Sequence, residues 1–185
     1  MVLPVYVYGN AVLRKQTQKI EEDDPELKTL IDNMYETMYK SDGVGLAAPQ
    51  VGISKRIFII DAEPMEEDDP DLKGFKKVFI NPEIIEEEGK KWPFNEGCLS
   101  LPTIREDIER HSDLRITYYD ENFEFHDEKY NGIKARIIQH EYDHLNGVLF
   151  IDRLPALKKK LLTPKLKAIS AGNVDVNYKI RTAKK

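Results

Sequence analysis

Cysteine is nearly absent from this sequence, and long hydrophobic runs are missing. The single cysteine among 185 residues, Cys98, excludes a disulfide framework and indicates a reducing compartment. No stretch approaches the ~18 apolar residues of a membrane span, and residues 1–9 lack the charged start and apolar core of a signal peptide. We therefore expect a cytoplasmic protein without a membrane partner.

Length and charge predict one acidic domain with a basic end. A hydrophobic content of 41% suits a single domain over residues 1–185. Residues 153–185 carry ten Lys and Arg against one acid, Asp175, whereas residues 1–152 carry 18 basic and 32 acidic side chains. The basic C-terminal segment is either a solvated helix face or a contact for anionic nucleic acid, and we expect no DNA partner.

The strongest chemical signal is residues 139–144, Gln-His-Glu-Tyr-Asp-His. On a helix, His140 and His144 lie on one face about one turn apart, ~6 Å along the axis, so both imidazoles can bind one metal ion. Glu141 lies beside them and can take a proton from water on that metal without being a ligand. Chance occurrence in a polar helix is the alternative interpretation.

A catalytic metal usually has a third protein ligand, which lies elsewhere in the chain. A metzincin would have histidine at the position of Phe150, and a thermolysin-like site needs a later glutamate, but none follows Glu141. Cys98, within the sequence Glu-Gly-Cys-Leu-Ser, can supply a thiolate that suits a borderline-soft divalent ion. The alternative for Cys98 is a small buried hydrophobe.

A third motif at residues 43–52, Gly-Val-Gly-Leu-Ala-Ala-Pro-Gln-Val-Gly, does not fit a nucleotide-binding loop. The preceding stretch is helical in pattern, and Pro49 blocks the helix that a dinucleotide site requires. The small residues instead predict close approach of another backbone, such as that of a peptide substrate.

In this order and spacing, the three motifs resemble the signatures of the peptide deformylase family. The resemblance covers residues 1–152. It implies hydrolysis of the N-formyl group from the formylmethionine of newly made polypeptides, with release of formate. The implied partners are N-formylmethionyl nascent peptides, and if the basic segment contacts a nucleic acid rather than only solvent, we expect it to be the RNA of the ribosome. The resemblance favours Fe(II), while the Cys/His/His donor set also suits Zn(II), Ni(II) or Co(II).

The resemblance also assigns roles outside the metal ligands. It implies that the Gln50 amide and the backbone N–H of Leu99 stabilise the oxyanion, and that the peptide pairs with backbone near Gly45. The expected substrate-binding residues are Val44, Gly45, Phe94, Glu96, Gly97, Arg105, Ile133 and Ile137. Glu96 and Arg105 are expected to form an ion pair. Ordinary core packing and a surface ion pair are the alternative for these residues.

Two other function classes fit the same residues. Another metal-dependent amide hydrolase or peptidase could use Cys98, His140 and His144, and cleavage of internal peptide bonds would distinguish it. A binding module with a structural metal fits less well, because a structural zinc site normally has four protein ligands and only three candidates are found here.

Hydrophobic periodicity predicts the individual helices and strands. Together with the resemblance, they imply an α+β fold in which antiparallel sheets pack around a central helix carrying the His-Glu-x-x-His motif, followed by a C-terminal helix and strand. Three helices are predicted. The first begins after Asp24, the second spans 132–145, and the third spans 155–169 with an interruption at Pro164. The predicted strands are 56–61, 77–85, 114–119, 123–126 and 174–180, with a turn at 88–89. Residues 62–74 form an acidic surface loop without assigned function, and His111 and His126 are expected to lie outside the metal site.

Overall fold

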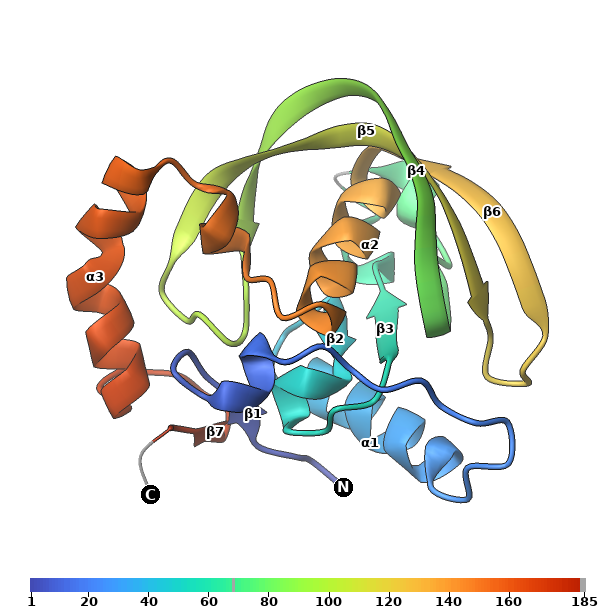
Figure 1. Cartoon of the computed structure of the whole chain (residues 1–185), viewed down its shortest axis with the longest axis horizontal. Helices are drawn as coiled ribbons and strands as arrows, with labels where there is room; N and C mark the ends of the chain where they lie inside the picture. The colour runs from blue at the N-terminus through green and yellow to red at the C-terminus, as the bar shows by residue number, and fades with distance from the viewer. Residues whose placement is uncertain (68, 184–185) are drawn as a thin grey trace.

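A five-stranded antiparallel sheet arches over one helix in the computed structural model, which describes residues 1–67 and 69–183 (Figure 1). The strand order is β2-β3-β4-β5-β6. The strands are β2 (Gly45–Ala47), β3 (Ile57–Asp61), β4 (Lys76–Gly97), β5 (Arg105–Tyr119) and β6 (Phe125–Asn131). The covered helix is α2 (Gly132–Leu145), which carries the His-Glu-x-x-His motif. The predicted α+β fold is confirmed.

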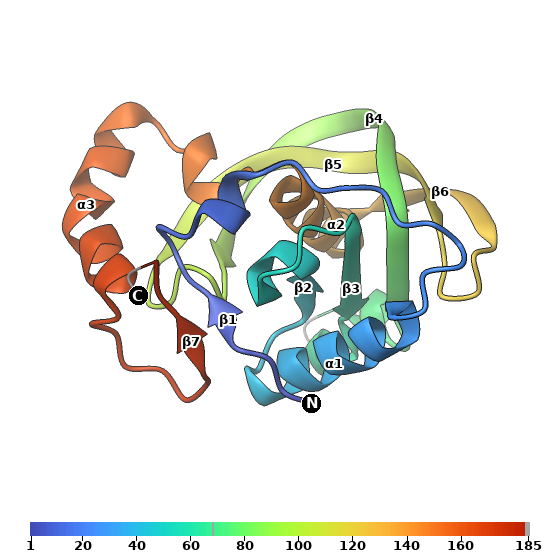
Figure 2. The same ribbon diagram turned by 60° about the horizontal axis from the view of Figure 1, so that its bottom comes forward.

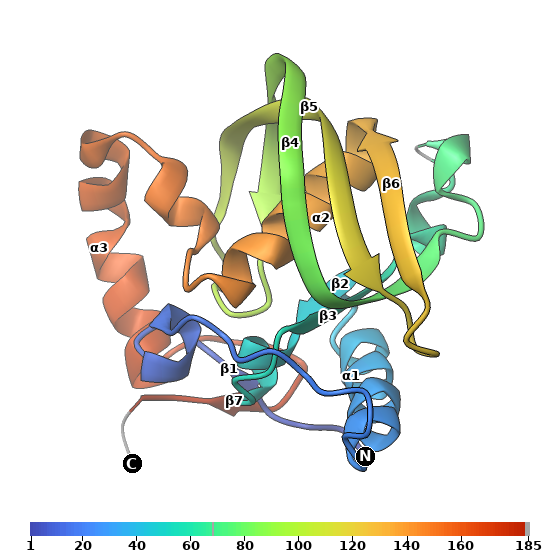
Figure 3. The same cartoon turned by 45° about the vertical axis from the view of Figure 1, so that its right-hand side comes forward.

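The helix α2 is held in the arch by an apolar face. Ala135, Ile138 and Leu145 are fully buried, and they pack in one cluster with residues of β3 to β5 such as Phe58 and Ile116. Figure 3 shows α2 lying across the inner face of the strands β4, β5 and β6. The motif histidines are therefore fixed to a helix that packing prevents from rotating.

A second helix, α1 (Leu27–Lys40), packs on the other side of the short strands. Its residues Leu30, Met34 and Met38 recur at helical spacing and are buried against Ile57 and Ile59 of β3. This helix was predicted, and its methionines pack in the core.

The strand β4 is longer than predicted, because the chain does not turn at 88–89. Instead β4 runs on to Gly97, and its pairing with β5 shifts register between Glu88 and Lys91. Gly89 has φ of +75°, which allows the chain to continue through this β-bulge. The partner strand β5 begins at Arg105 rather than at 114. Residues 105–113 are mostly polar and were not predicted as strand, but they alternate between the two faces of the sheet.

The C-terminal segment differs from the prediction in two respects. The helix α3 (Ala156–Ala171) continues through Pro164, which is an exposed residue. Proline removes one helical hydrogen bond, the one to the carbonyl of Lys160, and Lys160 is also exposed. The expected strand at 174–180 is reduced to β7 (Ile180–Arg181). It pairs in parallel with β1 (Val5–Tyr6) (Figure 2).

The remaining regular elements are short 3₁₀ helices. They are η1 (Ala11–Arg14), η2 (Ala48–Val51), η3 (Glu63–Met65), η4 (Pro70–Leu72) and η5 (Phe150–Arg153). The predicted surface loop at 62–74 contains η3 and η4, and Leu72 anchors it in the core, while Asp68 lies outside the described residues. Among the helices that the structure describes, none combines the length and apolar character needed to cross a bilayer.

Gly147, just after α2, packs closely against the backbone of Arg14. Its φ is +71°, and an added Cβ would lie 2.6 Å from the carbonyl oxygen of Arg14. Gly74 has a similar φ of +66°, with nothing within 4 Å of an added Cβ. We expect Gly74→Ala to cost ~1 kcal/mol of stability for its backbone conformation, and Gly147→Ala ~3 kcal/mol because the Arg14 backbone must also move. Urea unfolding measures both, and equal losses would contradict the proposed collision.

Candidate active site

Cys98, His140 and His144 come together at one point of the fold. One ligand atom from each lies within 4.8 Å of the others, although Cys98 follows the end of β4 and the histidines lie on successive turns of α2. Cys98 Sγ is 3.3 Å from His144 Nε2, and the two imidazole rings are 5.2 Å apart. One thiol and two imidazoles are three protein ligands, the number typical of a catalytic metal site, where a further position is kept for water.

The surroundings of these side chains fit a bound cation. His140 Nδ1 lies 2.9 Å from Glu96 Oε2, which leaves Nε2 available as a ligand. Burial opposes protonation of His140, but Cys98 and Glu96 outweigh burial and raise its pKa to about 10. Burial lowers the pKa of His144 well below its ordinary value, so this ring is neutral and can bind a metal. The negative charge of Glu96 that favours a proton on His140 also favours a nearby metal cation.

Glu141 is enclosed beside this donor set. Its Oε2 is buried and has no hydrogen-bond partner among the described residues. Burial raises the pKa of Glu141 to about 7. Gly45 of β2 lies against this carboxylate, because a Cβ on Gly45 would be 2.5 Å from Glu141 Oε1. The small residue at position 45 thus allows β2 to approach α2 and exclude solvent from Glu141.

The Gln50 amide is oriented by its own backbone. Gln50 Oε1 accepts a hydrogen bond from the N–H of Ala47 at 2.8 Å, so Nε2 points toward the site. Nε2 lies 3.5 Å from Cys98 Sγ and 3.3 Å from Ser100 Oγ. A buried donor is therefore held next to the donor set.

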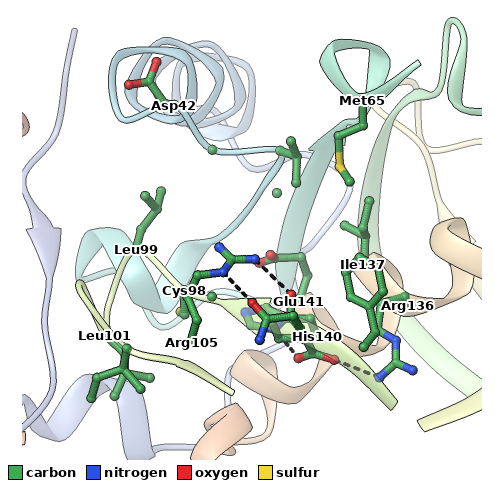
Figure 4. Close-up of a pocket in the computed structure, with 18 of the residues that line it drawn as sticks. Asp42, Met65, Cys98, Leu99, Leu101, Arg105, Arg136, Ile137, His140 and Glu141 are labelled. Carbon is green, nitrogen blue, oxygen red and sulfur yellow. Dashed lines mark hydrogen bonds and ion pairs between the residues drawn. The ribbon is translucent and has the colours of Figure 1, made fainter. Parts of the chain in front are cut away.

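All of the predicted substrate-binding residues line one cavity of about 580 Å³ beside these groups (Figure 4). They are Val44, Gly45, Phe94, Glu96, Gly97, Arg105, Ile133 and Ile137. Gln50, Cys98, Leu99, His140 and Glu141 line the same cavity. The sequence did not indicate that Met65, Ile104 or Arg136 would also line it.

The two histidines expected to lie outside the site do so. His111 Nδ1 lies 3.1 Å from the carbonyl oxygen of Gly89, in the β4–β5 region. His126 Nε2 lies 2.8 Å from Asp120 Oδ2, in a polar group with Glu124 at the β5–β6 turn.

Comparison with known proteins identifies the family. A family model described as polypeptide deformylase matches residues 2–160. The peptide deformylase of Christiangramia forsetii is 52% identical over 98% of this chain and 96% of its own length. That of Flavobacterium psychrophilum is 49% identical over 100% of this chain and 99% of its own.

Solved structures agree with this result. A peptide deformylase from Plasmodium falciparum matches with a TM-score of 0.81 at 40% identity, over 91% of this chain and 95% of that one. One from Legionella pneumophila matches with a TM-score of 0.81 at 35% identity, over 94% and 98%. The chain belongs to the peptide deformylase family. It is a metal-dependent hydrolase that removes the N-formyl group from newly made polypeptides.

The buried carboxylate of Glu96 orients one of the histidines of the site, His140. Glu96 accepts hydrogen bonds from Arg110 Nε at 2.7 Å and Nη2 at 3.0 Å, and from Arg136 Nη1 at 3.0 Å, besides its contact with His140. Burial raises the pKa of Glu96, but His140 and Arg110 outweigh burial and hold it well below its usual range. Glu96 therefore stays ionised and keeps the His140 ring in one orientation.

The expected ion pair between Glu96 and Arg105 is wrong. Arg105 donates instead to Asn95, from Nε to Oδ1 at 2.8 Å and from Nη2 to the carbonyl at 2.9 Å. Successive residues of a strand point to opposite faces, so Glu96 turns to the buried face while Asn95 turns to the exposed one with Arg105.

Arg110 is the functional-site residue that sequence reasoning missed most clearly. It is fully buried in β5 and links Glu96 to Asp143 of α2, with Nη1 at 2.8 Å from Asp143 Oδ2. Arg153 closes the network with two bonds of 2.7 Å to Asp143. The available signal was the spacing from Ile108, because residues two apart share a strand face, but the segment did not look like a strand.

We expect Arg110→Met to destabilise the enzyme by ~3–5 kcal/mol, because it leaves the carboxylates of Glu96 and Asp143 without their shared buried partner. Arg115→Met is the matched control. Arg115 also makes two hydrogen bonds to one carboxylate, Asp127, but both side chains are more than a third exposed. Denaturant unfolding should show a much smaller loss for the control. Equal losses would mean that Arg110 does not act through buried charge.

Proposed function

We propose that Cys98, His140 and His144 hold the metal ion of this deformylase and that Glu141 carries the proton during hydrolysis. The observation that carries the proposal is a buried Glu141, whose Oε2 has no partner in the described part of the chain, beside the converging donor set. A divalent ion in such a site lowers the pKa of water and polarises a carbonyl group.

Glu141 has the properties required of a general base and acid. It takes the proton of the attacking water and later gives it to the departing amine of the peptide. A group that does both works best when its pKa is close to the pH of the reaction, and burial raises that of Glu141 to about 7. Formate and a free amino terminus are the products.

The developing oxyanion is stabilised by two donors, the Gln50 amide and the backbone N–H of Leu99. Support comes from the fixed orientation of Gln50, whose oxygen is occupied by Ala47 N–H so that its NH₂ group faces Cys98. Donors held in place before the reaction stabilise charge without reorganisation.

The peptide substrate binds across the cavity. The strand β2 lies at one edge of the sheet, so its outer side at Gly45 can pair with an extended peptide. The methionine side chain enters the apolar part of the cavity, between Val44, Phe94, Ile133 and Ile137. Glu96, Gly97 and Arg105 complete the wall beside it.

The bound ion in the cell is Fe(II). Soft thiolate and borderline imidazole donors suit it, and the same set accepts Zn(II), Ni(II) or Co(II), so availability decides the occupant. Elemental analysis of protein purified without air identifies it. We further propose that residues 1–185 form one catalytic domain that works in the cytoplasm, where formylated nascent peptides are made.

Glu141→Gln tests the proton carrier. We expect a 10²- to 10⁴-fold lower kcat for formate release from formyl-Met-Ala-Ser, because the amide cannot accept the proton of water. Metal content should be unchanged, since Glu141 is not a ligand. Glu22→Gln, on the exposed surface, is the control and should match the parent. A metal-loaded Glu141→Gln protein with near-normal kcat would exclude this role, and cleavage of internal peptide bonds by the parent would favour a peptidase.

Segment 153–185 is proposed to contact the ribosome. Lys160, Lys165 and Lys167 are exposed on α3, as are Leu157 and Leu161, which are 70% and 72% exposed. A basic surface of this kind binds nucleic-acid phosphates.

Reversing the charge of three exposed lysines tests this contact. Replacing Lys160, Lys165 and Lys167 by Glu should weaken co-sedimentation with ribosomes several-fold, because the phosphate contacts become repulsive. The control replaces Lys28, Lys40 and Lys73, also exposed, and makes the same change in net charge. If both triple variants sediment alike, the basic segment is not the contact.

A further inference from the structure

After α3, the chain returns to the mouth of the active-site cavity. Figure 2 shows this segment, residues 173–183, running back from the end of α3 to lie alongside β1. The Tyr178 hydroxyl donates to the carbonyl of Leu99 at 2.9 Å. The neighbouring Asn177 Nδ2 lies 3.3 Å from Asp42 Oδ2. Leu99 and Asp42 both line the cavity, so the segment contacts two of its walls.

This returning segment is anchored to the body of the protein. The N–H of Val5 donates to the carbonyl of Lys179 at 2.8 Å, and Asn10 Nδ2 donates to the carbonyl of Arg181 at 2.9 Å. Val174 and Ile180 pack against the apolar cluster that also contacts Cys98. Tyr178 is therefore presented to Leu99 from a fixed backbone.

Leu99 lies in a tight turn that follows Cys98. The N–H of Leu101 donates to the carbonyl of Cys98 at 2.9 Å, which closes a β-turn with Leu99 and Ser100 at its centre. The N–H of Tyr8 holds the carbonyl of Ser100 at 2.9 Å. The Tyr178 hydroxyl holds the other central carbonyl, that of Leu99.

We propose that Tyr178 is a positioning residue of this deformylase, which fixes the Leu99 turn so that the Leu99 N–H stays directed at the reacting carbonyl oxygen. This inference rests on the oxyanion role proposed for Leu99. A backbone donor is effective only where its turn holds it within about 0.5 Å of the productive position. Tyr178 acts through Leu99 and does not touch the substrate.

The experiment compares two tyrosine-to-phenylalanine variants of the full-length, metal-loaded enzyme. Tyr178→Phe removes the bond to Leu99. Tyr35→Phe is the matched control, because the Tyr35 hydroxyl also donates to a backbone carbonyl, that of Lys77 at 3.2 Å, but on α1 outside the cavity. We expect Tyr178→Phe to lower kcat ~3- to 10-fold with KM within twofold, because a displaced oxyanion donor weakens only the transition state. Tyr35→Phe should change neither constant.

Amide hydrogen exchange of the turn supplies a readout that does not need turnover. Exchange of the peptide covering residues 98–101 should become several-fold faster in Tyr178→Phe and stay unchanged in Tyr35→Phe. Unchanged exchange and unchanged kcat in Tyr178→Phe would overturn the proposal, as would an equal loss of kcat in the two variants. If the parent releases no formate, the proposed function fails instead, and hydrogen exchange alone decides whether Tyr178 fixes the turn.

Discussion

The ionised carboxylate of Glu96 is the constraint on which the site depends. A buried charge is tolerated only with close partners, and Glu96 has them on two elements, Arg110 of β5 and both His140 and Arg136 of α2. These partners meet only when α2 lies at one depth and one rotation under the arch. The contact between Glu96 and Nδ1 of His140 therefore also directs Nε2 of His140 toward Cys98, which directly follows the end of β4.

The convergence of Cys98, His140 and His144 could be predicted because most of its information is local. His140, Glu141 and His144 follow from helical spacing alone, and Cys98 is the single cysteine in the chain. The supporting network could not be predicted in this way. Arg110 lies 14 residues from Glu96 and 33 from Asp143, and its pairing depends on a β-bulge near Gly89 that sets the register of β4 against β5.

Two errors in the predicted fold, at Gly89 and at Pro164, have a common physical origin, since each concerns a local signal that tertiary packing overrides. Gly89 is typical of a turn, but pairing with β5 keeps β4 extended through a bulge. Pro164 is typical of a helix break, but Leu162, Leu166 and Ile169 are buried on one face and hold α3 together across it. The expected Glu96–Arg105 ion pair is wrong for a separate reason. Asn95 and Glu96 are adjacent in β4 and point to opposite faces, so Arg105 meets Asn95 and not Glu96.

The short strand β2 encloses Glu141 and is also an edge of the sheet. Gly45 lets β2 approach α2 so closely that Glu141 is shielded from water, and burial raises its pKa to about 7. The same strand is the edge of the sheet, where an extended peptide can pair. A side chain at position 45 would therefore act twice, since it would displace the Glu141 carboxylate and push the edge of β2 away from α2. The requirement for glycine at this position follows from both effects, and neither is visible in the spacing of the motif alone.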